Sequence, residues 1–265
     1  MKTLIVTGCS WTDGSIQGFP RHLKPWGKYL AERLNMNLVN LGNSGSGNEG
    51  ALSRVLDYIA LGHPIDLVVA MWTEQERIDW EGDWTLRNEE LEMSKLLPNE
   101  WFADNPERNT GAYANPTFTL EQHRKFSLTK NKDSKDPRYN GHIKKVMVAR
   151  KQFRTFYMFQ ELMKAWSIPY FQTQGTNPIT QFDERAVNDV CKEILRNEYT
   201  EKLDNRFIGW PIFEKLGGTT MNNMLDNLDK DRTKYRVHPK DDSHPNDAGH
   251  ELIADYLYKE IKKCQ

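Results

Sequence analysis

The chain has 265 residues, and its 36 lysines and arginines nearly balance its 37 aspartates and glutamates, leaving a formal net charge of −1 at pH 7. This balance gives no electrostatic reason to expect nucleic acid or a membrane surface as a partner. Hydrophobic residues make up 38% of the chain and charged residues 28%, as in ordinary soluble proteins. The length accommodates one α/β domain with insertions, or two small domains.

The cysteines and histidines give no sign of a metal site. Cys9, Cys191 and Cys264 are odd in number and lack metal-ligand spacing, which indicates free thiols in a reducing compartment. The histidines show no ligand spacing with acids or cysteines, so we expect no metal ion. The first apolar run is too short for a signal peptide and no later run is long enough to cross a bilayer, so we expect cytoplasmic synthesis.

The first quarter of the chain alternates between strand and helix patterns. Leu4–Val6 is a short apolar run that ends in a glycine, as is typical of a buried parallel strand entering a tight loop. Apolar residues at helical spacing follow Pro25, and Asn37–Leu41 returns to a strand pattern. A glycine-rich loop at 42–48 leads to another helix and then to the strand Asp66–Met71. This alternation predicts a parallel sheet with helices on both faces.

Between about residues 80 and 150 the apolar periodicity is poor, and prolines interrupt it at Pro98, Pro106, Pro116 and Pro137. The first part of this segment is acidic and the second part is basic. We interpret it as an insertion. It is either a lid or specificity module, or a solvated excursion whose opposite charges partly neutralise each other, and the second interpretation is favoured because charge runs are usually just exposed.

The alternation resumes after the insertion. The pattern predicts a helix from Phe153 to Trp166, a strand over Pro169–Thr173 and a helix from about Glu184 to Tyr199. Phe207–Ile212 is either a short fifth strand or a buried loop, and the last helix begins near Asp247. We therefore predict one domain over residues 1–265, an α/β fold with a three-layer, doubly wound, flavodoxin-like parallel sheet of about five strands and one large polar insertion.

Polar residues follow the predicted strands at the points where they end. Ser10 follows the first strand, the loop 42–48 the second and Thr73 the third, so all are expected at one edge of the sheet, where parallel sheets bind ligands. Asp241 and His244 precede the last helix, where a loop can close over the same edge. An acid three residues before a histidine supplies a base and its orienting partner, and a serine supplies a nucleophile.

These motifs resemble the sequence blocks of the SGNH hydrolases, also called the GDSL family. Gly8-Cys9-Ser10 is similar to the first block, Asn40–Gly45 to the second and Asp241-x-x-His244-Pro245 to the fifth, in the same order along the chain. Cys9 stands where the family usually has an acid, and the middle of the chain is unlike a minimal member. The tryptophan after the serine is also similar to hydrolase-like proteins encoded by bacteriophages.

The resemblance implies a Ser-His-Asp triad and no cofactor. Ser10 would attack an ester carbonyl, His244 would take its proton, and Asp241 would hold the imidazole and stabilise its charged form. The backbone N–H groups of Ser10 and Gly45 would form part of an oxyanion hole, because a glycine lets the main chain approach a substrate closely.

The third oxyanion donor is where the chain departs from the family. SGNH proteins place a Gly-x-Asn-Asp block after the third strand, whereas this chain has Met71-Trp72-Thr73-Glu74-Gln75. We expect the hydroxyl of Thr73 to replace the asparagine amide, with Gln75 or Asn48 as less favoured substitutes. Loss of one such donor typically costs roughly a hundred- to a thousandfold in rate, which is consistent with a slow or specialised enzyme.

The expected function is hydrolysis of an ester on a small molecule or a polysaccharide, with a carbohydrate O-acetyl or other small acyl ester as the expected substrate. Trp11 and Trp72 flank the predicted site, where they either stack on a sugar or shape an acyl pocket, unless they serve ordinary packing. The alternative function is a catalytically weak or inactive SGNH-like module with a structural or glycan-binding role. With that alternative, association with a virion and assembly into a particle or oligomer stay open.

Each motif alone has a simpler interpretation. Asp241, Asp242 or Asn246 could cap the last helix while His244 is polar surface. The loop 42–48 could be a flexible turn or a phosphate-cradling loop of a nucleotide-binding protein, although it lacks the P-loop ending and the full dinucleotide fingerprint. The occurrence of all three motifs in order, each at a strand end or before the last helix, favours the hydrolase interpretation.

Overall fold

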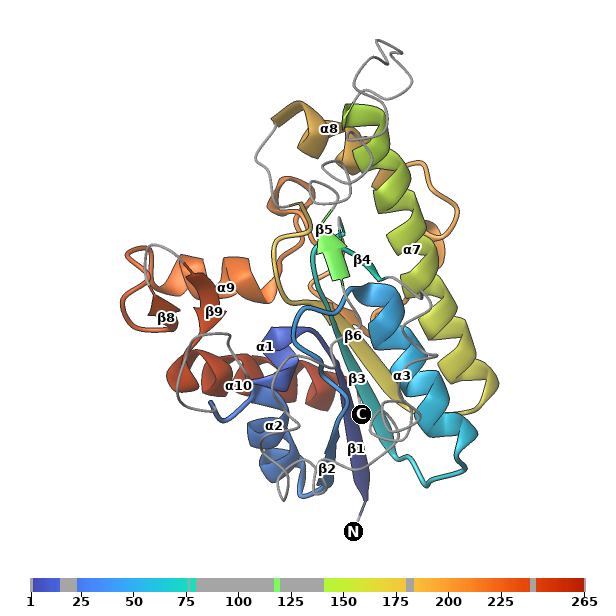
Figure 1. Cartoon of the computed structure of the whole chain (residues 1–265), viewed down its shortest axis with the longest axis vertical. Helices are drawn as coiled ribbons and strands as arrows, with labels where there is room; N and C mark the ends of the chain where they lie inside the picture. The colour runs from blue at the N-terminus through green and yellow to red at the C-terminus, as the bar shows by residue number, and fades with distance from the viewer. Residues whose placement is uncertain are drawn as a thin grey trace, which may run out of the picture.

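The computed structural model describes residues 2–14, 23–75, 77–79, 117–119, 141–179, 184–238 and 242–264. A five-stranded sheet with the order β2-β1-β3-β6-β7 forms its centre, and every neighbouring pair in it is parallel (Figure 1). Its strands are β1 (Thr3–Gly8), β2 (Asn37–Asn40), β3 (Leu67–Trp72), β6 (Tyr170–Gln174) and β7 (Phe207–Ile208). The chain runs outward from β1 to β2 and returns to β3 on the other side of β1, so the strand order reverses at β1 and β3. Doubly wound folds place their ligands at this point.

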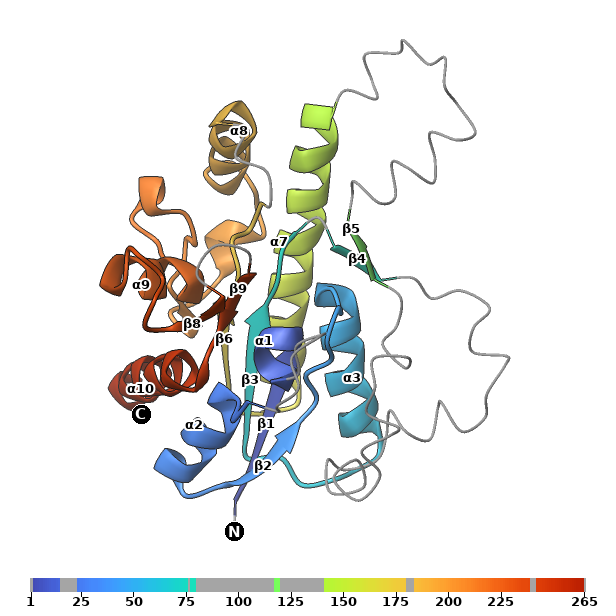
Figure 2. The same ribbon diagram turned by 60° about the vertical axis from the view of Figure 1, so that its left-hand side comes forward.

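Helices cover both faces of the sheet, with α2 and α10 on one side and α3 and α7 on the other (Figure 2). A short helix, α1, follows β1 directly, and α8 packs against α7. The helices are α1 (Ser10–Asp13), α2 (Trp26–Leu34), α3 (Asn48–Ala60), α7 (Gly141–Ala165), α8 (Glu184–Ile194), α9 (Met221–Leu228) and α10 (Asp247–Lys263), with 3-10 turns at Thr200–Lys202 and Glu214–Leu216.

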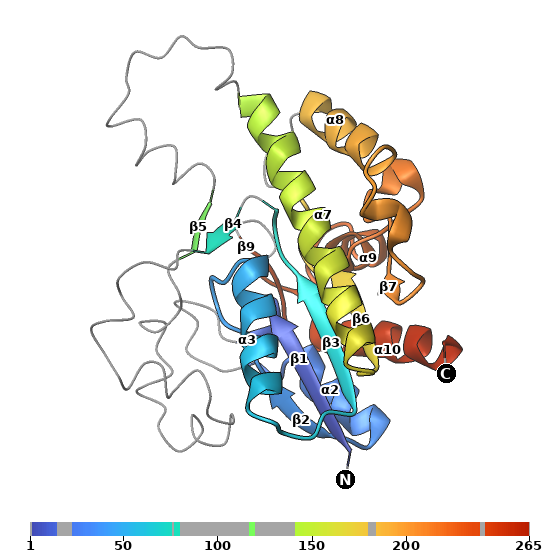
Figure 3. The ribbon, with the colours of Figure 1, turned by 90° about the vertical axis from the view of Figure 1, so that its right-hand side faces the viewer.

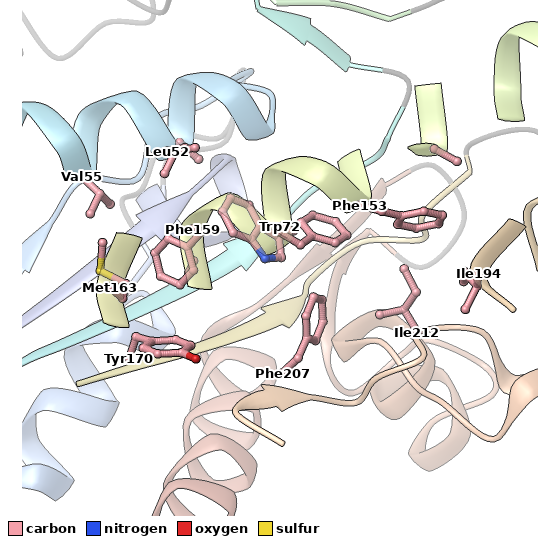
Figure 4. Packing of buried hydrophobic residues seen from close by; sticks show 14 of the residues in the cluster. Leu52, Val55, Trp72, Phe153, Phe159, Met163, Tyr170, Ile194, Phe207 and Ile212 are labelled. Carbon is pink, nitrogen blue, oxygen red and sulfur yellow. The ribbon is translucent and has the colours of Figure 1, made fainter. Parts of the chain in front are cut away.

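The core consists of two clusters separated by the sheet. Successive side chains of a strand point to opposite faces, so Leu4 and Val6 pack with α2 and α10 while Ile5 packs with α3 and α7. The second cluster is rich in aromatic residues, and Figure 4 shows the ring of Trp72 among the side chains of α7. Strands buried on both faces explain why β1 and β3 are almost continuously apolar in sequence.

Two small antiparallel pairs lie outside the central sheet. One pairs β4 (Arg77–Asp79) with β5 (Thr117–Thr119), and the other pairs β8 (Arg236–His238) with β9 (Asp242–Pro245). The second pair directly precedes α10, and β9 contacts α1 at the end of β1. It therefore brings the C-terminal motif to the carboxyl ends of the central strands.

The predicted α/β class and five-stranded parallel sheet are confirmed, and Phe207–Ile208 forms the fifth strand. Two expectations need correction. The helix expected from Phe153 begins at Gly141, because its first turns run beyond the sheet beside α8 and need little apolar periodicity (Figure 3). The residues before the last helix form a β-hairpin arm rather than a plain loop. Among the described helices, none combines the length and apolar character needed to span a bilayer.

Candidate functional site

Ser10 and His244 meet at the carboxyl edge of the sheet. The Oγ atom of Ser10 lies 2.6 Å from Nε2 of His244, although the two residues are 234 positions apart in the chain. At this distance the serine hydroxyl can donate a hydrogen bond to Nε2 whenever that nitrogen is unprotonated. Ser10 is only 6% exposed and His244 is partly buried, so the pair is largely shielded from bulk water. This is the geometry that a nucleophile and its general base require.

Ser10 is placed by a tight turn at the end of β1. Cys9 precedes the first turn of α1 and is buried in the core, and Ser10 is the first residue of that helix. The turn requires glycine at position 8. A Cβ atom on Gly8 would come within 2.3 Å of Thr12 Oγ1 and 2.5 Å of the Met71 carbonyl oxygen.

His244 is placed by the β8–β9 hairpin and by Asn246. The Nδ2 atom of Asn246 donates to the carbonyl oxygens of Lys234 and Arg236, at 2.9 and 3.1 Å. Its Oδ1 atom accepts from the N–H of Gly249 at 3.0 Å and so caps α10. The capping role considered for Asn246 is therefore real, and it coexists with the Ser10–His244 contact.

Trp11 separates His244 from a buried arginine. The ring of Trp11 is fully buried and its centroid lies 6.5 Å from that of His244, while the guanidinium of Arg236 lies 5.4 Å from the Trp11 ring centroid. Arg236 donates to the carbonyl oxygen of Asn222 at 3.0 Å and to a carboxylate oxygen of Asp226 at 2.7 Å. Burial lowers the pKa of Arg236 below the usual arginine value, and the charge of Asp226 opposes that effect. The Trp11 ring is therefore packed between His244 and Arg236, and its role in a substrate pocket stays a prediction.

A second histidine lies behind the site on α10. His250 is 1% exposed, and burial lowers its pKa to about 3, with a smaller contribution from the charge of His244. Its Nδ1 atom is buried without a hydrogen-bond partner within the described structure. His250 is therefore neutral at physiological pH and cannot add a positive charge next to His244.

The backbone donors expected from Ser10 and Gly45 are available. Among the described residues, neither N–H group has a hydrogen-bond acceptor. Gly45 is exposed and has φ of +80°, and apart from its chain neighbours no atom of the described residues lies within 4 Å of the position of a Cβ, so this side of the loop has room for a substrate. Left-handed backbone of this kind favours glycine.

The three side chains considered for the third oxyanion donor differ in their hydrogen-bond partners. The Thr73 hydroxyl donates to Glu74 Oε2 at 2.7 Å. The Asn48 amide donates to Gln152 Oε1 at 2.9 Å and accepts from the Thr73 N–H at 2.8 Å. Gln75 is 2% exposed, and its Nε2 atom is buried with no acceptor within the described structure. Of the three, only Gln75 has an uncommitted donor.

Of the remaining predicted site residues, one lies outside the described part of the chain and the other lies in the core. Asp241 lies outside the described residues. Trp72 is fully buried, donates from Nε1 to Gln172 Oε1 at 2.9 Å and stacks on Phe156 at a centroid distance of 5.2 Å, so its ring belongs to the core and does not line a substrate pocket. Trp72 follows the strand alternation that directs its side chain to the aromatic face of the sheet.

A separate cavity of about 280 Å³ lies beyond the carboxyl ends of β6 and β7. Its walls are mainly apolar and include Pro178, Ile179, Ile212 and Phe213. Its described lining includes neither Ser10 nor His244, so it is not the site of the serine–histidine pair.

Sequence reasoning missed Arg54, Arg236 and His250 as neighbours of the site. Arg54 and His250 carry a signal in the pattern, because each is a polar residue on the apolar side of a helix. Arg54 precedes Val55 on α3, and His250 precedes Ile253 by one helical turn on α10. Arg236 has no such signal, since its burial follows from the pairing of β8 with β9.

No protein-family model and no curated protein matches the sequence. Solved structures match it along nearly its whole length. A protein assigned to the lipolytic G-D-S-L family from Desulfitobacterium hafniense is 14% identical, with 98% of this chain and 99% of that chain covered and a TM-score of 0.42. A member of the same family from Veillonella parvula is 12% identical, with 99% and 100% covered and a TM-score of 0.46. An α/β hydrolase, LAE5, from the metagenome of Lake Arreo is 16% identical, with 100% and 96% covered and a TM-score of 0.39. At these identities, the function has to be argued from the residues of this chain.

Proposed function

We propose that the protein is a serine hydrolase of the SGNH type that cleaves an ester, with Ser10 as nucleophile and His244 as general base. The contact between Ser10 Oγ and His244 Nε2, at 2.6 Å, carries the proposal. Sequence motifs pointed to these two residues from opposite ends of the chain. Packing of the fold alone does not require their side chains to lie at hydrogen-bond distance. The resemblance of the three sequence blocks to SGNH hydrolases supports the same chemistry.

The reaction follows from the roles of these groups. Nε2 of His244 takes the proton of the Ser10 hydroxyl as Oγ attacks the ester carbonyl, and the resulting imidazolium returns a proton to the leaving alkoxide. Water then hydrolyses the acyl-serine with the same base. We assign Asp241 to hold the Nδ1–H of His244, which fixes the tautomer that leaves Nε2 free to accept.

The oxyanion hole combines two backbone donors with one side chain. The N–H groups of Ser10 and Gly45 have no acceptor among the described residues, and a developing oxyanion would supply one. We assign the third donor to Gln75 in place of Thr73. A buried amide nitrogen without an acceptor costs roughly 1–3 kcal/mol, and an oxyanion would remove that cost only in the transition state.

The substrate we propose is a small acyl ester, such as a carbohydrate O-acetyl group. Only 6% of Ser10 is exposed and the fully buried Trp11 lies next to it, which favours a short acyl group over a long chain. The apolar cavity of about 280 Å³ does not border Ser10 in its described lining.

Labelling with a fluorophosphonate probe tests the proposal, together with hydrolysis of p-nitrophenyl acetate. The wild type should be labelled and should turn over, whereas Ser10→Ala should lose labelling and His244→Gln should reduce it by a factor of about a thousand or more. Ser53→Ala on α3 and His63→Gln, at an exposed position, serve as matched controls. Equal labelling of the wild type and Ser10→Ala would refute the hydrolase proposal. The alternative, a structural or glycan-binding role, would then remain.

A further inference from the structure

The guanidinium of Arg54, on α3, connects the ends of the first two strands. Its Nε atom donates to the carbonyl oxygen of Leu41 at 2.7 Å, Nη1 donates to Ser46 Oγ at 3.0 Å, and Nη2 donates to the carbonyl oxygen of Gly8 at 3.1 Å. Arg54 is 9% exposed, so these contacts are almost fully shielded from water. Hydrogen bonds from an ionised donor are roughly twice as strong as neutral ones, and a planar guanidinium holds its partners in a fixed geometry.

The partners of Arg54 belong to the two segments that carry the backbone oxyanion donors. Gly8 is two residues before Ser10, while Leu41 and Ser46 flank the loop that contains Gly45. The two segments are also joined directly, because the N–H of Asn43 donates to the Gly8 carbonyl oxygen at 3.0 Å. Gly8 O therefore accepts from both the loop and the arginine.

Resting on the proposed hydrolase function, we propose that Arg54 is a positioning residue that fixes the N–H of Gly45 relative to the N–H and Oγ of Ser10. Oxyanion donors act only when they lie about 2.7–3.1 Å from the developing charge, and a misplacement of about 1 Å can cost about a hundredfold in rate. Gly45 is exposed and its loop is rich in glycine, so the position of the Gly45 N–H depends on such an anchor. The guanidinium also stays protonated and adds positive potential behind the oxyanion hole.

Kinetics of Arg54→Met and Arg54→Lys test this role. Methionine keeps most of the side-chain length and removes all the donors, so kcat should fall about ten- to a hundredfold. KM should stay within about threefold, because the lost interaction acts in the transition state. Arg54→Lys keeps the charge with fewer bonds and should recover part of the loss. Arg33→Met is the matched control, since Arg33 forms its ion pairs with Asp255 and Glu251 of α10.

A second readout does not depend on activity. Hydrogen exchange at the N–H groups of Asn43 and Ser46 should accelerate in Arg54→Met at least about tenfold relative to Arg33→Met, because both amides are bonded within the segment that Arg54 anchors. Unchanged exchange, or a kcat equal to that of the wild type, would overturn the proposal. If the wild type neither turns over nor reacts with the fluorophosphonate, the hydrolase function fails and exchange alone decides the role of Arg54. If Arg54→Met does not fold, Arg54→Lys is compared in its place.

Discussion

Gln75 and Thr73 are two residues apart, yet their side-chain donors differ in whether they have a hydrogen-bond acceptor. The Thr73 hydroxyl already donates to Glu74, while Gln75 Nε2 is buried without an acceptor among the described residues. We predict that Gln75→Leu, which keeps the size of the side chain, lowers kcat by about a hundred- to a thousandfold. Thr73→Val should change kcat by less than about tenfold. Steady-state hydrolysis of p-nitrophenyl acetate measures both, and a larger loss in Thr73→Val would return the donor role to Thr73.

His250 makes stability depend on pH. Its folded-state pKa of about 3 lies below the ordinary histidine value of 6.5, so below pH 6.5 the unfolded chain binds a proton that the folded chain does not. The stabilisation is therefore complete above pH 6.5 and is lost as the pH falls toward 3, by about 1.4 kcal/mol per pH unit from this group. Urea unfolding between pH 7 and 5 should show a shallower loss in His250→Leu than in the wild type. An unchanged slope would mean that His250 is protonated in the fold.

The β8–β9 hairpin and α10 act together through one side chain, Asn246. We predict that Asn246→Ala destabilises the protein by about 1–2 kcal/mol through loss of the helix cap alone, and that it slows fluorophosphonate labelling of Ser10 because the hairpin is released. Asn246→Asp retains the cap acceptor and should regain most of the stability but not the labelling rate. Thr220→Ala removes the comparable cap of α9 and should leave labelling unchanged. If the labelling rate of Ser10 changed in proportion to the free energy of unfolding in all three variants, a specific role for the hairpin would be contradicted.

The elements that sequence predicts well are those whose pattern is set by burial. Buried strands such as β1 and β3 are apolar runs and amphipathic helices such as α10 have a periodic stripe, so both can be read locally. The pairing of β8 with β9 depends on residues around Arg236 whose contacts lie on α9, and no local pattern records it. The motifs predicted that Ser10 and His244 meet, whereas our proposal of Gln75 in place of Thr73 needed the hydrogen-bond partners of each side chain.

At the scale of the whole molecule, both core clusters share one sheet, and this predicts a single cooperative unit. Phe156 and Leu257 are fully buried on opposite faces, and each contributes to a different cluster. Phe156→Ala should cost about 3–5 kcal/mol and Leu257→Ala about 2–5 kcal/mol. Because the two sites share no cluster, their effects should add within about 0.5 kcal/mol in the double variant.

In urea, tryptophan fluorescence, far-UV circular dichroism and labelling of Ser10 should report one coincident transition for the wild type and each single variant. A single-domain chain requires that coincidence, since the tryptophans that contribute to the fluorescence include Trp26 in one core cluster and Trp72 in the other. Two resolved transitions would show that the helical layers unfold independently, and the one-domain prediction would then be wrong.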